Sequence, residues 1–271
     1  HWNGSWDWDE VSTPILMPVE RSGRQFDALV HPGRNGYLWT LERHADRIGF
    51  VDAEPYVYQN AFSGIDPETG RPSYDPSHTP STGESVDFCP SLWGGKDWPP
   101  AAYNPGTGFV YIPVNENHCG VIEGREVTYM PGGSYTGART EFTLRDPQGN
   151  IGQIQAWDMD SGEEVWSVEF QSHNWGGILT TAGNLIFSGG TSDRFFRAHD
   201  ALTGEELWRF RTNSGIIGVP STFSVDGKQY VAIQSGWGVD AAGMTARIDQ
   251  QRGTRTFVPQ GGVVWVFALP E

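Results

Sequence analysis

Two aspartates near the start of the chain, in Trp6-Asp7-Trp8-Asp9, have the residue type and spacing of an acid–base or cation-binding pair. On an extended segment, residues i and i+2 point to the same face, so the Asp7 and Asp9 carboxylates could share one cation. A carboxylate held beside a metal ion can remove a proton from a hydroxyl group. Solvated or capping aspartates give the same pattern, and the pattern alone does not separate these readings.

Other candidate residues lie in loops. Arg34, in an Arg-Asn-Gly turn, could stabilise developing negative charge or could be a solvated turn arginine. Asp97 and Trp98 follow two glycines and a lysine, and Trp175 precedes two glycines that let a backbone approach closely. For each tryptophan, Trp237 included, core packing is the alternative.

Cysteine usage narrows the possibilities further. Only Cys89 and Cys119 are present, which excludes a four-cysteine zinc site and a Cys-x-x-Cys-His haem attachment. The pair forms either one disulfide in an oxidising compartment or two buried thiols.

Composition excludes two classes of partner. The chain carries 18 Lys+Arg against 33 Asp+Glu, a net charge of −15, whereas a nucleic-acid-binding face must be basic. No apolar stretch approaches the roughly 18 residues that a membrane span requires. We therefore expect neither nucleic acid binding nor a membrane span.

An internal repeat defines the architecture that must position these residues. Segment 156–166, Ala-Trp-Asp-Met-Asp-Ser-Gly-Glu-Glu-Val-Trp, is echoed by 198–208, Ala-His-Asp-Ala-Leu-Thr-Gly-Glu-Glu-Leu-Trp. The Asp-x-x-x-Gly part predicts a tight turn, and the Trp a large wedge between stacked sheets. A period of about 42 residues with about four short strands per unit is typical of a β-propeller blade.

Hairpins elsewhere extend this prediction to the whole chain. Strand pairs flanking Gly- and Asn-rich turns near 28–41, 101–112 and 222–233, with a last strand at 262–269, give an all-β fold of about four blades. We expect insertions near 63–88 and 123–150, and helix signals are poor throughout. Four blades in an open ring would expose a blade face to water. Residues 1–271 are therefore interpreted as the C-terminal part of one propeller domain, whose N-terminal half is a separate or clipped chain.

Taken together, these motifs resemble the pyrroloquinoline-quinone (PQQ) dependent alcohol dehydrogenases of the methanol/ethanol type, which are eight-bladed propellers. The chain looks like the C-terminal half of this family. The matching segments are Ser5-Trp6-Asp7-Trp8-Asp9, 34–41, Cys89-Pro90-Ser91, 94–103, Trp175-Gly176-Gly177 and the two blade repeats.

The resemblance implies roles for the candidate residues. Asp7 would be the catalytic base, removing the alcohol proton while hydride passes to PQQ, and Arg34 would support the quinone oxygens. Asp97, Trp98 and Trp175 would contact the cofactor. In family members that use lanthanides an extra aspartate sits where Asp9 lies, but calcium remains equally open for a metal held by Asp7 and Asp9.

The resemblance also implies the remaining chemistry and the surroundings. Cys89 and Cys119 match a cysteine pair that forms a disulfide in the family, and Trp237 would line the substrate cavity. The other metal ligands lie in the family's N-terminal half. The expected protein is periplasmic, oxidises a primary or secondary alcohol, and passes electrons to a cytochrome c or another acceptor. The rival prediction is a non-catalytic quinoprotein-like propeller that serves as a scaffold or binding module.

Overall fold

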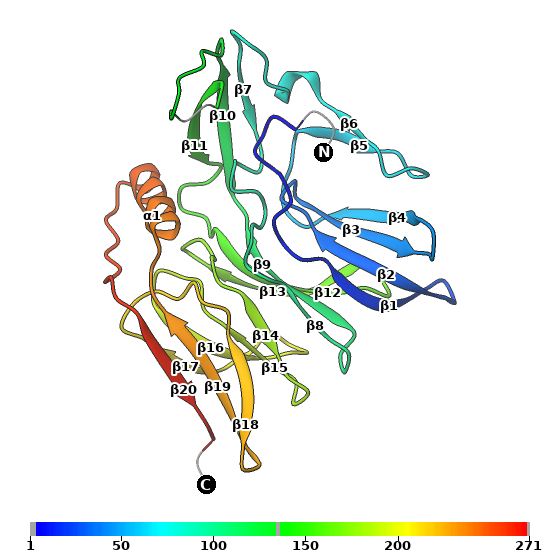
Figure 1. Cartoon of the computed structure of the whole chain (residues 1–271), viewed down its shortest axis with the longest axis vertical. Helices are drawn as coiled ribbons and strands as arrows, with labels where there is room; N and C mark the ends of the chain where they lie inside the picture. The colour runs from blue at the N-terminus through cyan, green and yellow to red at the C-terminus, as the bar shows by residue number, and fades with distance from the viewer. Residues whose placement is uncertain (1–3, 134–135, 270–271) are drawn as a thin grey trace. The chain divides into compact units, whose positions relative to one another are not determined.

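The computed structural model describes residues 4–133 and 136–269, which form sheets of short antiparallel strands (Figure 1). Two compact units divide the chain: residues 1–17, 27–97 and 116–147, called unit 1 here, and residues 18–26, 98–115 and 148–271, called unit 2. The strands are β1 (Ile15–Arg21), β2 (Arg24–Pro32), β3 (Tyr37–Arg43), β4 (Ile48–Pro55), β5 (Phe62–Ile65), β6 (Pro72–Tyr74), β7 (Ser85–Phe88), β8 (Ala102–Asn104), β9 (Phe109–Asn115), β10 (His118–Gly124), β11 (Ala138–Leu144), β12 (Gly152–Asp158), β13 (Glu163–Phe170), β14 (Ile178–Thr180), β15 (Leu185–Ser188), β16 (Phe195–Asp200), β17 (Glu206–Arg211), β18 (Ser221–Val225), β19 (Lys228–Ser235) and β20 (Val263–Phe267); the helices are the 3-10 turn η1 (Pro76–His78) and α1 (Val239–Arg252).

Unit 1 holds most of one four-stranded sheet and all of a three-stranded sheet. Their strand orders are β1-β2-β3-β4 and β11-β10-β7, and a β5-β6 hairpin accompanies them. The two ranges expected to be insertions supply β7 and β11, the strands on either side of β10. An aromatic core fills this unit, built mainly from Trp6, Trp8, Tyr37, Phe62 and Phe88.

Unit 2 holds three further sheets, with the orders β13-β12-β9-β8, β14-β15-β16-β17 and β18-β19-β20. Successive sheets share apolar cores: Ile154 and Ile186 lie in one cluster, and Phe196 and Ile233 in the next. Sheets of three or four antiparallel strands, joined by short turns and packed face on face, are the blades of a β-propeller. The predicted all-β propeller is therefore confirmed.

The two repeat segments build the same turn, as their sequences predict. The Gly162 N–H donates to the Asp158 carbonyl oxygen at 2.8 Å, and the Gly204 N–H to the Asp200 carbonyl at 2.9 Å. Both glycines have positive φ, 77° and 75°, which a residue without a Cβ adopts at low cost. The turns thus start β13 and β17 in the same way.

The repeat also connects one sheet to the next. Trp166, at the end of the first copy, donates from Nε1 to the carbonyl of Ala201 in the second copy at 3.2 Å. Its ring lies against Gly204, where an added Cβ would come within 2.7 Å of the indole. Trp208, at the end of the second copy, packs edge-on against Phe267 of the last sheet. Each repeat tryptophan is therefore the wedge that the sequence predicts.

Although helix signals in the sequence are poor, an α-helix, α1, spans Val239–Arg252. Its buried residues are Ala241, Met244, Thr245 and Ile248, which recur at helical spacing, and Gly253 ends it with φ 66°. Gly243 inside the segment and Gly238 before it obscured this pattern. In Figure 1, α1 follows β19 and leads the chain back to β20.

The Gly204 contact predicts a graded stability effect. Gly204→Ala places a methyl group against Trp166 and holds an L-residue at positive φ, whereas Gly108→Ala, at φ 78°, meets nothing within 4 Å. We expect Gly108→Ala to lower the free energy of unfolding by about 1–2 kcal/mol, and Gly204→Ala by about 1–3 kcal/mol more. Urea unfolding measures both, and equal losses would contradict the wedge interpretation.

Candidate functional site

The site in unit 1 begins with two buried tryptophans. Trp6 and Trp8 are 0% and 2% exposed, and their rings stack 5.2 Å apart. Each indole also donates a hydrogen bond at 3.0 Å, Trp6 to the His78 carbonyl and Trp8 to the Ser91 carbonyl. These anchors fix the segment, so the aspartates that alternate with them turn away from the core.

Asp7 and Asp9 both lie near one common partner, Arg34. The Asp7 carboxylate lies 3.8 Å from Nη2 of Arg34, and the Asp9 carboxylate 4.0 Å from Nη1. The backbone, however, is not the simple extended segment expected: Asp7 has φ 62°, in the left-handed region. Aspartate is among the residues that tolerate this conformation, which is often found at functional sites.

Arg34 is held at the end of β2 by the turn that leads to β3. It is 8% exposed, and Nη2 donates to the Leu92 carbonyl oxygen and lies 3.5 Å from the Asp97 carboxylate. Its Nε is buried and makes no hydrogen bond within the described part of the chain. A buried guanidinium with an unused donor, facing carboxylates at ion-pair distance, is poised to bind a further acceptor.

The loop that carries Asp97 packs directly on this turn. An added Cβ at Gly94 would lie 2.7 Å from Cβ of Arg34, and the Gly95 N–H donates to the Arg34 carbonyl at 3.0 Å. The glycines before Asp97 therefore allow the two backbones to touch. Cys89 and Cys119 form the predicted disulfide, which ties the start of this loop to β10.

A pocket of about 610 Å³ opens beside the aspartates. Asp7 and Asp9 line it together with apolar groups that include Trp8, Leu92 and Ile122. A carboxylate at the edge of a partly apolar pocket is a suitable place for a small organic molecule with one polar group.

Electrostatics favour a cation next to these aspartates. Three carboxylates, from Asp7, Asp9 and Asp97, surround the Arg34 guanidinium, so the cluster carries a net negative charge. Partial burial and the charge of Asp9 raise the pKa of Asp7, while Arg34 opposes the rise. Carboxylate oxygens are the ligands that calcium and other hard cations prefer, so the residues present fit such an ion.

Two ionisable residues that the sequence analysis left without a role belong to the same region. Lys96 is 1% exposed and donates from Nζ to the Asp97 carbonyl oxygen at 2.7 Å. Burial lowers the pKa of its ammonium to about 8, although Glu10 and Asp97 oppose the shift. Glu10 accepts a hydrogen bond from the Arg34 backbone. The signals available were the position of Glu10 directly after Asp9 and the rarity of lysine, at only two residues.

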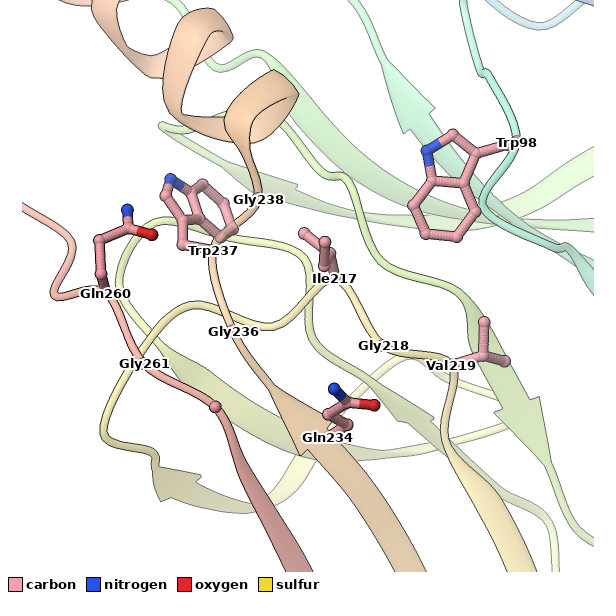
Figure 2. Close-up of a pocket in the computed structure, with 11 residues that line it drawn as sticks. Trp98, Ile217, Gly218, Val219, Gln234, Gly236, Trp237, Gly238, Gln260 and Gly261 are labelled. Atoms are coloured by element: carbon pink, nitrogen blue, oxygen red, sulfur yellow. The ribbon is translucent and has the colours of Figure 1, made fainter.

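The candidate tryptophans lie in unit 2. Trp98 and Trp237 line one pocket of about 560 Å³, together with Ile217, Val219 and Gln260, and Figure 2 shows the two indoles facing it from opposite sides. Trp237 also packs against His173, with ring centroids 5.3 Å apart. Trp175 is 5% exposed, and its backbone N–H donates to the Gly190 carbonyl oxygen. The roles of these residues stay predictions.

No group of three or more His, Cys, Asp or Glu side chains is placed to hold a metal in the ranges 4–133 and 136–269. No helix in those ranges has the length and hydropathy of a membrane span.

Known proteins resemble this chain in both sequence and structure. Residues 167–231 match the family model for the glucose/ethanol/alcohol dehydrogenase β-propeller domain. Quinoprotein alcohol dehydrogenase PedH of Pseudomonas putida is 35% identical over 98% of this chain and 44% of its own length. The lanthanide-dependent methanol dehydrogenase of Methylacidiphilum fumariolicum is 39% identical over 86% of this chain and 38% of its own. A europium-containing methanol dehydrogenase structure superposes with a TM-score of 0.86 at 35% identity, covering 98% of this chain and 49% of that one.

The fold and these similarities define a quinoprotein-type β-propeller. The chain is similar to about the C-terminal half of quinoprotein alcohol and methanol dehydrogenases, as its motifs indicated. It spans less than half the length of the relatives described above.

The burial of Lys96 predicts a pH-dependent stability. Between about pH 8 and 10.5 the unfolded chain keeps the lysine proton and the folded chain does not, so this group makes stability rise with pH. The free energy of unfolding of the wild type, minus that of Lys96→Met, should grow by up to about 3 kcal/mol across this range. Urea unfolding at several pH values tests this, with Lys228→Met as the charge-matched control. A flat difference would show that the ammonium is not desolvated in the folded protein.

Proposed function

We propose that the protein containing this chain oxidises a primary or secondary alcohol, with PQQ as the electron acceptor and a metal ion as the Lewis acid. The observation that carries the proposal is the cluster in unit 1, where Asp7, Asp9 and Asp97 surround the buried Arg34 at the edge of a pocket. The family of the chain supplies the reaction class. Its relatives include quinoprotein alcohol and methanol dehydrogenases.

Asp7 is the base in this proposal. Its carboxylate faces the pocket, and burial together with Asp9 raises its pKa, which increases its affinity for the proton of an alcohol hydroxyl. Arg34 holds Asp7 in place and, being buried and always charged, stabilises negative charge that develops beside it. The apolar side chains of Leu92 and Ile122 keep water from part of the pocket.

Candidate binding residues can be named for both the cofactor and the metal. Asp7 and Asp9 would hold the ion, either calcium or a lanthanide, and Arg34, Asp97, Trp98 and Trp175 would hold PQQ. When bound, PQQ supplies the acceptor for the hydride, and the ion supplies Lewis acidity and keeps a carboxylate ionised. Trp237, which lines the pocket of unit 2, would line the substrate cavity as the resemblance implies.

The proposal requires a larger protein than this chain. The N-terminal half of the same propeller would supply the remaining metal ligands, because Asp7 and Asp9 offer only two side chains. A cytochrome c or another acceptor would remove the electrons, and a net charge of −15 would steer a basic partner to the surface. We infer a periplasmic location, where the Cys89–Cys119 disulfide persists.

A non-catalytic propeller scaffold is the alternative. Such a scaffold needs the blade repeats, but it has no reason to keep Asp7, Asp9, Arg34 and Asp97 together. Like charges brought together beside a pocket cost free energy, and a functional site repays that cost. The cluster therefore favours catalysis.

The role of Asp7 leads to a direct test. Asp7→Asn keeps the size of the side chain but removes the base, so we expect alcohol oxidation by the complete enzyme, measured with a redox dye, to fall at least ~100-fold. Asp27→Asn removes the same charge from an exposed position on β2 and should leave the rate unchanged. Near-normal turnover in Asp7→Asn would exclude Asp7 as the base.

Asp9 should affect the choice of metal. Removing one negative ligand weakens the attraction of a trivalent ion more than that of a divalent ion, by one further charge–charge term worth roughly 4 kcal/mol near 4 Å at an effective dielectric constant of about 20. With metal-free Asp9→Asn, we expect the affinity for lanthanum to fall at least ~10-fold more than that for calcium. Titration of both ions, read by the recovery of activity, measures this, and equal losses would contradict a charge-matching role.

A further inference from the structure

Glu10 connects the segment of Asp7 and Asp9 to the turn that carries Arg34. Its Oε1 accepts a hydrogen bond from the Arg34 backbone N–H at 3.1 Å, and Oε2 lies 3.4 Å from the same nitrogen. Oε2 also pairs with Nε2 of His31 at 2.7 Å. The Glu10 carboxylate thus contacts both His31, in β2, and Arg34, just after it. Glu10 itself lies three positions after Asp7, the proposed base.

The turn is shaped to receive this carboxylate. An added Cβ at Gly33 would lie 3.1 Å from Glu10 Oε1 and 2.8 Å from Asn35 Oδ1, so a residue without a side chain makes room there. From the other side, the Tyr56 hydroxyl donates to the Gly33 carbonyl oxygen at 2.7 Å. The backbone between His31 and Arg34 is therefore held from two directions.

The charge of Glu10 is also matched within the unit. His31 lies against its carboxylate, and the buried ammonium of Lys96 interacts with it electrostatically. The side chain is one-third exposed, yet both of its oxygens make directed contacts. A solvated surface glutamate does not need two such partners at fixed positions.

We propose that Glu10 is a positioning residue, which sets the place of the Arg34 guanidinium relative to Asp7 by fixing the Arg34 backbone. The inference rests on the proposed function for its effect on turnover, but not for its effect on structure. The Arg34 guanidinium lies 3.5–4.0 Å from three carboxylates, and these distances change if the Arg34 backbone shifts. Small displacements of a group that supports the reacting atoms reduce the rate without altering substrate binding.

The test separates the hydrogen bond from the charge. Glu10→Ala removes both, whereas Glu10→Gln removes the charge and keeps a carbonyl oxygen that accepts from the Arg34 N–H. Glu68→Ala, on the exposed turn between β5 and β6, is the control for loss of a glutamate. The three variants and the wild type are made in the complete enzyme.

The first readout is hydrogen exchange of the Arg34 amide, measured by mass spectrometry without substrate. Loss of a hydrogen bond to a charged acceptor should speed this exchange about 10- to 100-fold in Glu10→Ala. Glu10→Gln should stay within about threefold of the wild type, and Glu68→Ala should not change it. Unchanged exchange in Glu10→Ala, or equal acceleration in Glu68→Ala, would overturn the proposal.

The second readout is the steady-state rate with an alcohol. We expect kcat to fall about tenfold in Glu10→Ala while KM for the alcohol stays within about twofold, and Glu10→Gln to restore most of kcat. A loss of kcat that Glu10→Gln does not restore would overturn the positioning role. If the wild type oxidises no alcohol, the proposed function fails, but hydrogen exchange still decides whether Glu10 fixes Arg34.

Discussion

The burial of Trp6 and Trp8 is the interaction on which the site depends. Two indoles that each remove about 150–250 Å² from water contribute roughly 4–6 kcal/mol apiece. Opposing this, the left-handed φ of Asp7 costs about 1–2 kcal/mol, and two neighbouring carboxylates repel each other by a few kcal/mol at most. The burial of the tryptophans therefore decides the conformation of this segment. It holds the two aspartates beside Arg34 although their carboxylates repel each other.

Arg34 shows how the same region remains able to bind a ligand. A guanidinium this deeply buried requires partners, and it has the Leu92 carbonyl and three carboxylates. The carboxylates lie 3.5–4.0 Å away, longer than direct charge-assisted hydrogen bonds, and Nε lacks an acceptor within the described residues. Coulomb attraction thus stabilises the arginine without consuming its donors. The arginine therefore keeps a donor for the oxygen of a further neutral acceptor group, while the net negative charge of the carboxylates favours a cation beside them.

Sequence reasoning succeeded where contacts are local and repeated, and less well where they are tertiary. The Asp-x-x-x-Gly turns follow from residues four positions apart, whereas the left-handed backbone at Asp7, on the segment that brings Asp7 and Asp9 within 4.0 Å of Arg34, does not follow from the spacing. The helix after Trp237 was missed because Gly243 interrupts its apolar period. The hydrogen bond from Arg34 to Glu10 spans 24 positions, and no local pattern records it. Nor does composition show that Lys96 is buried, since lysine is usually exposed.

The tryptophans of this chain show why residue type alone cannot assign function. Trp166 and Trp208 are wedges: each follows a Glu-Glu pair and fixes one sheet against the next, and Glu206 of the second pair forms an ion pair with the buried Arg197 at 3.0 Å. Trp6 and Trp8 bury the same ring, but each is followed by an aspartate whose direction the ring dictates. The difference lies in what alternates with the tryptophan and in the pocket that these residues line. In unit 1 the alternating Asp7 and Asp9 line a pocket and lie within 4.0 Å of the buried Arg34, so the packing of Trp6 and Trp8 also positions the candidate site.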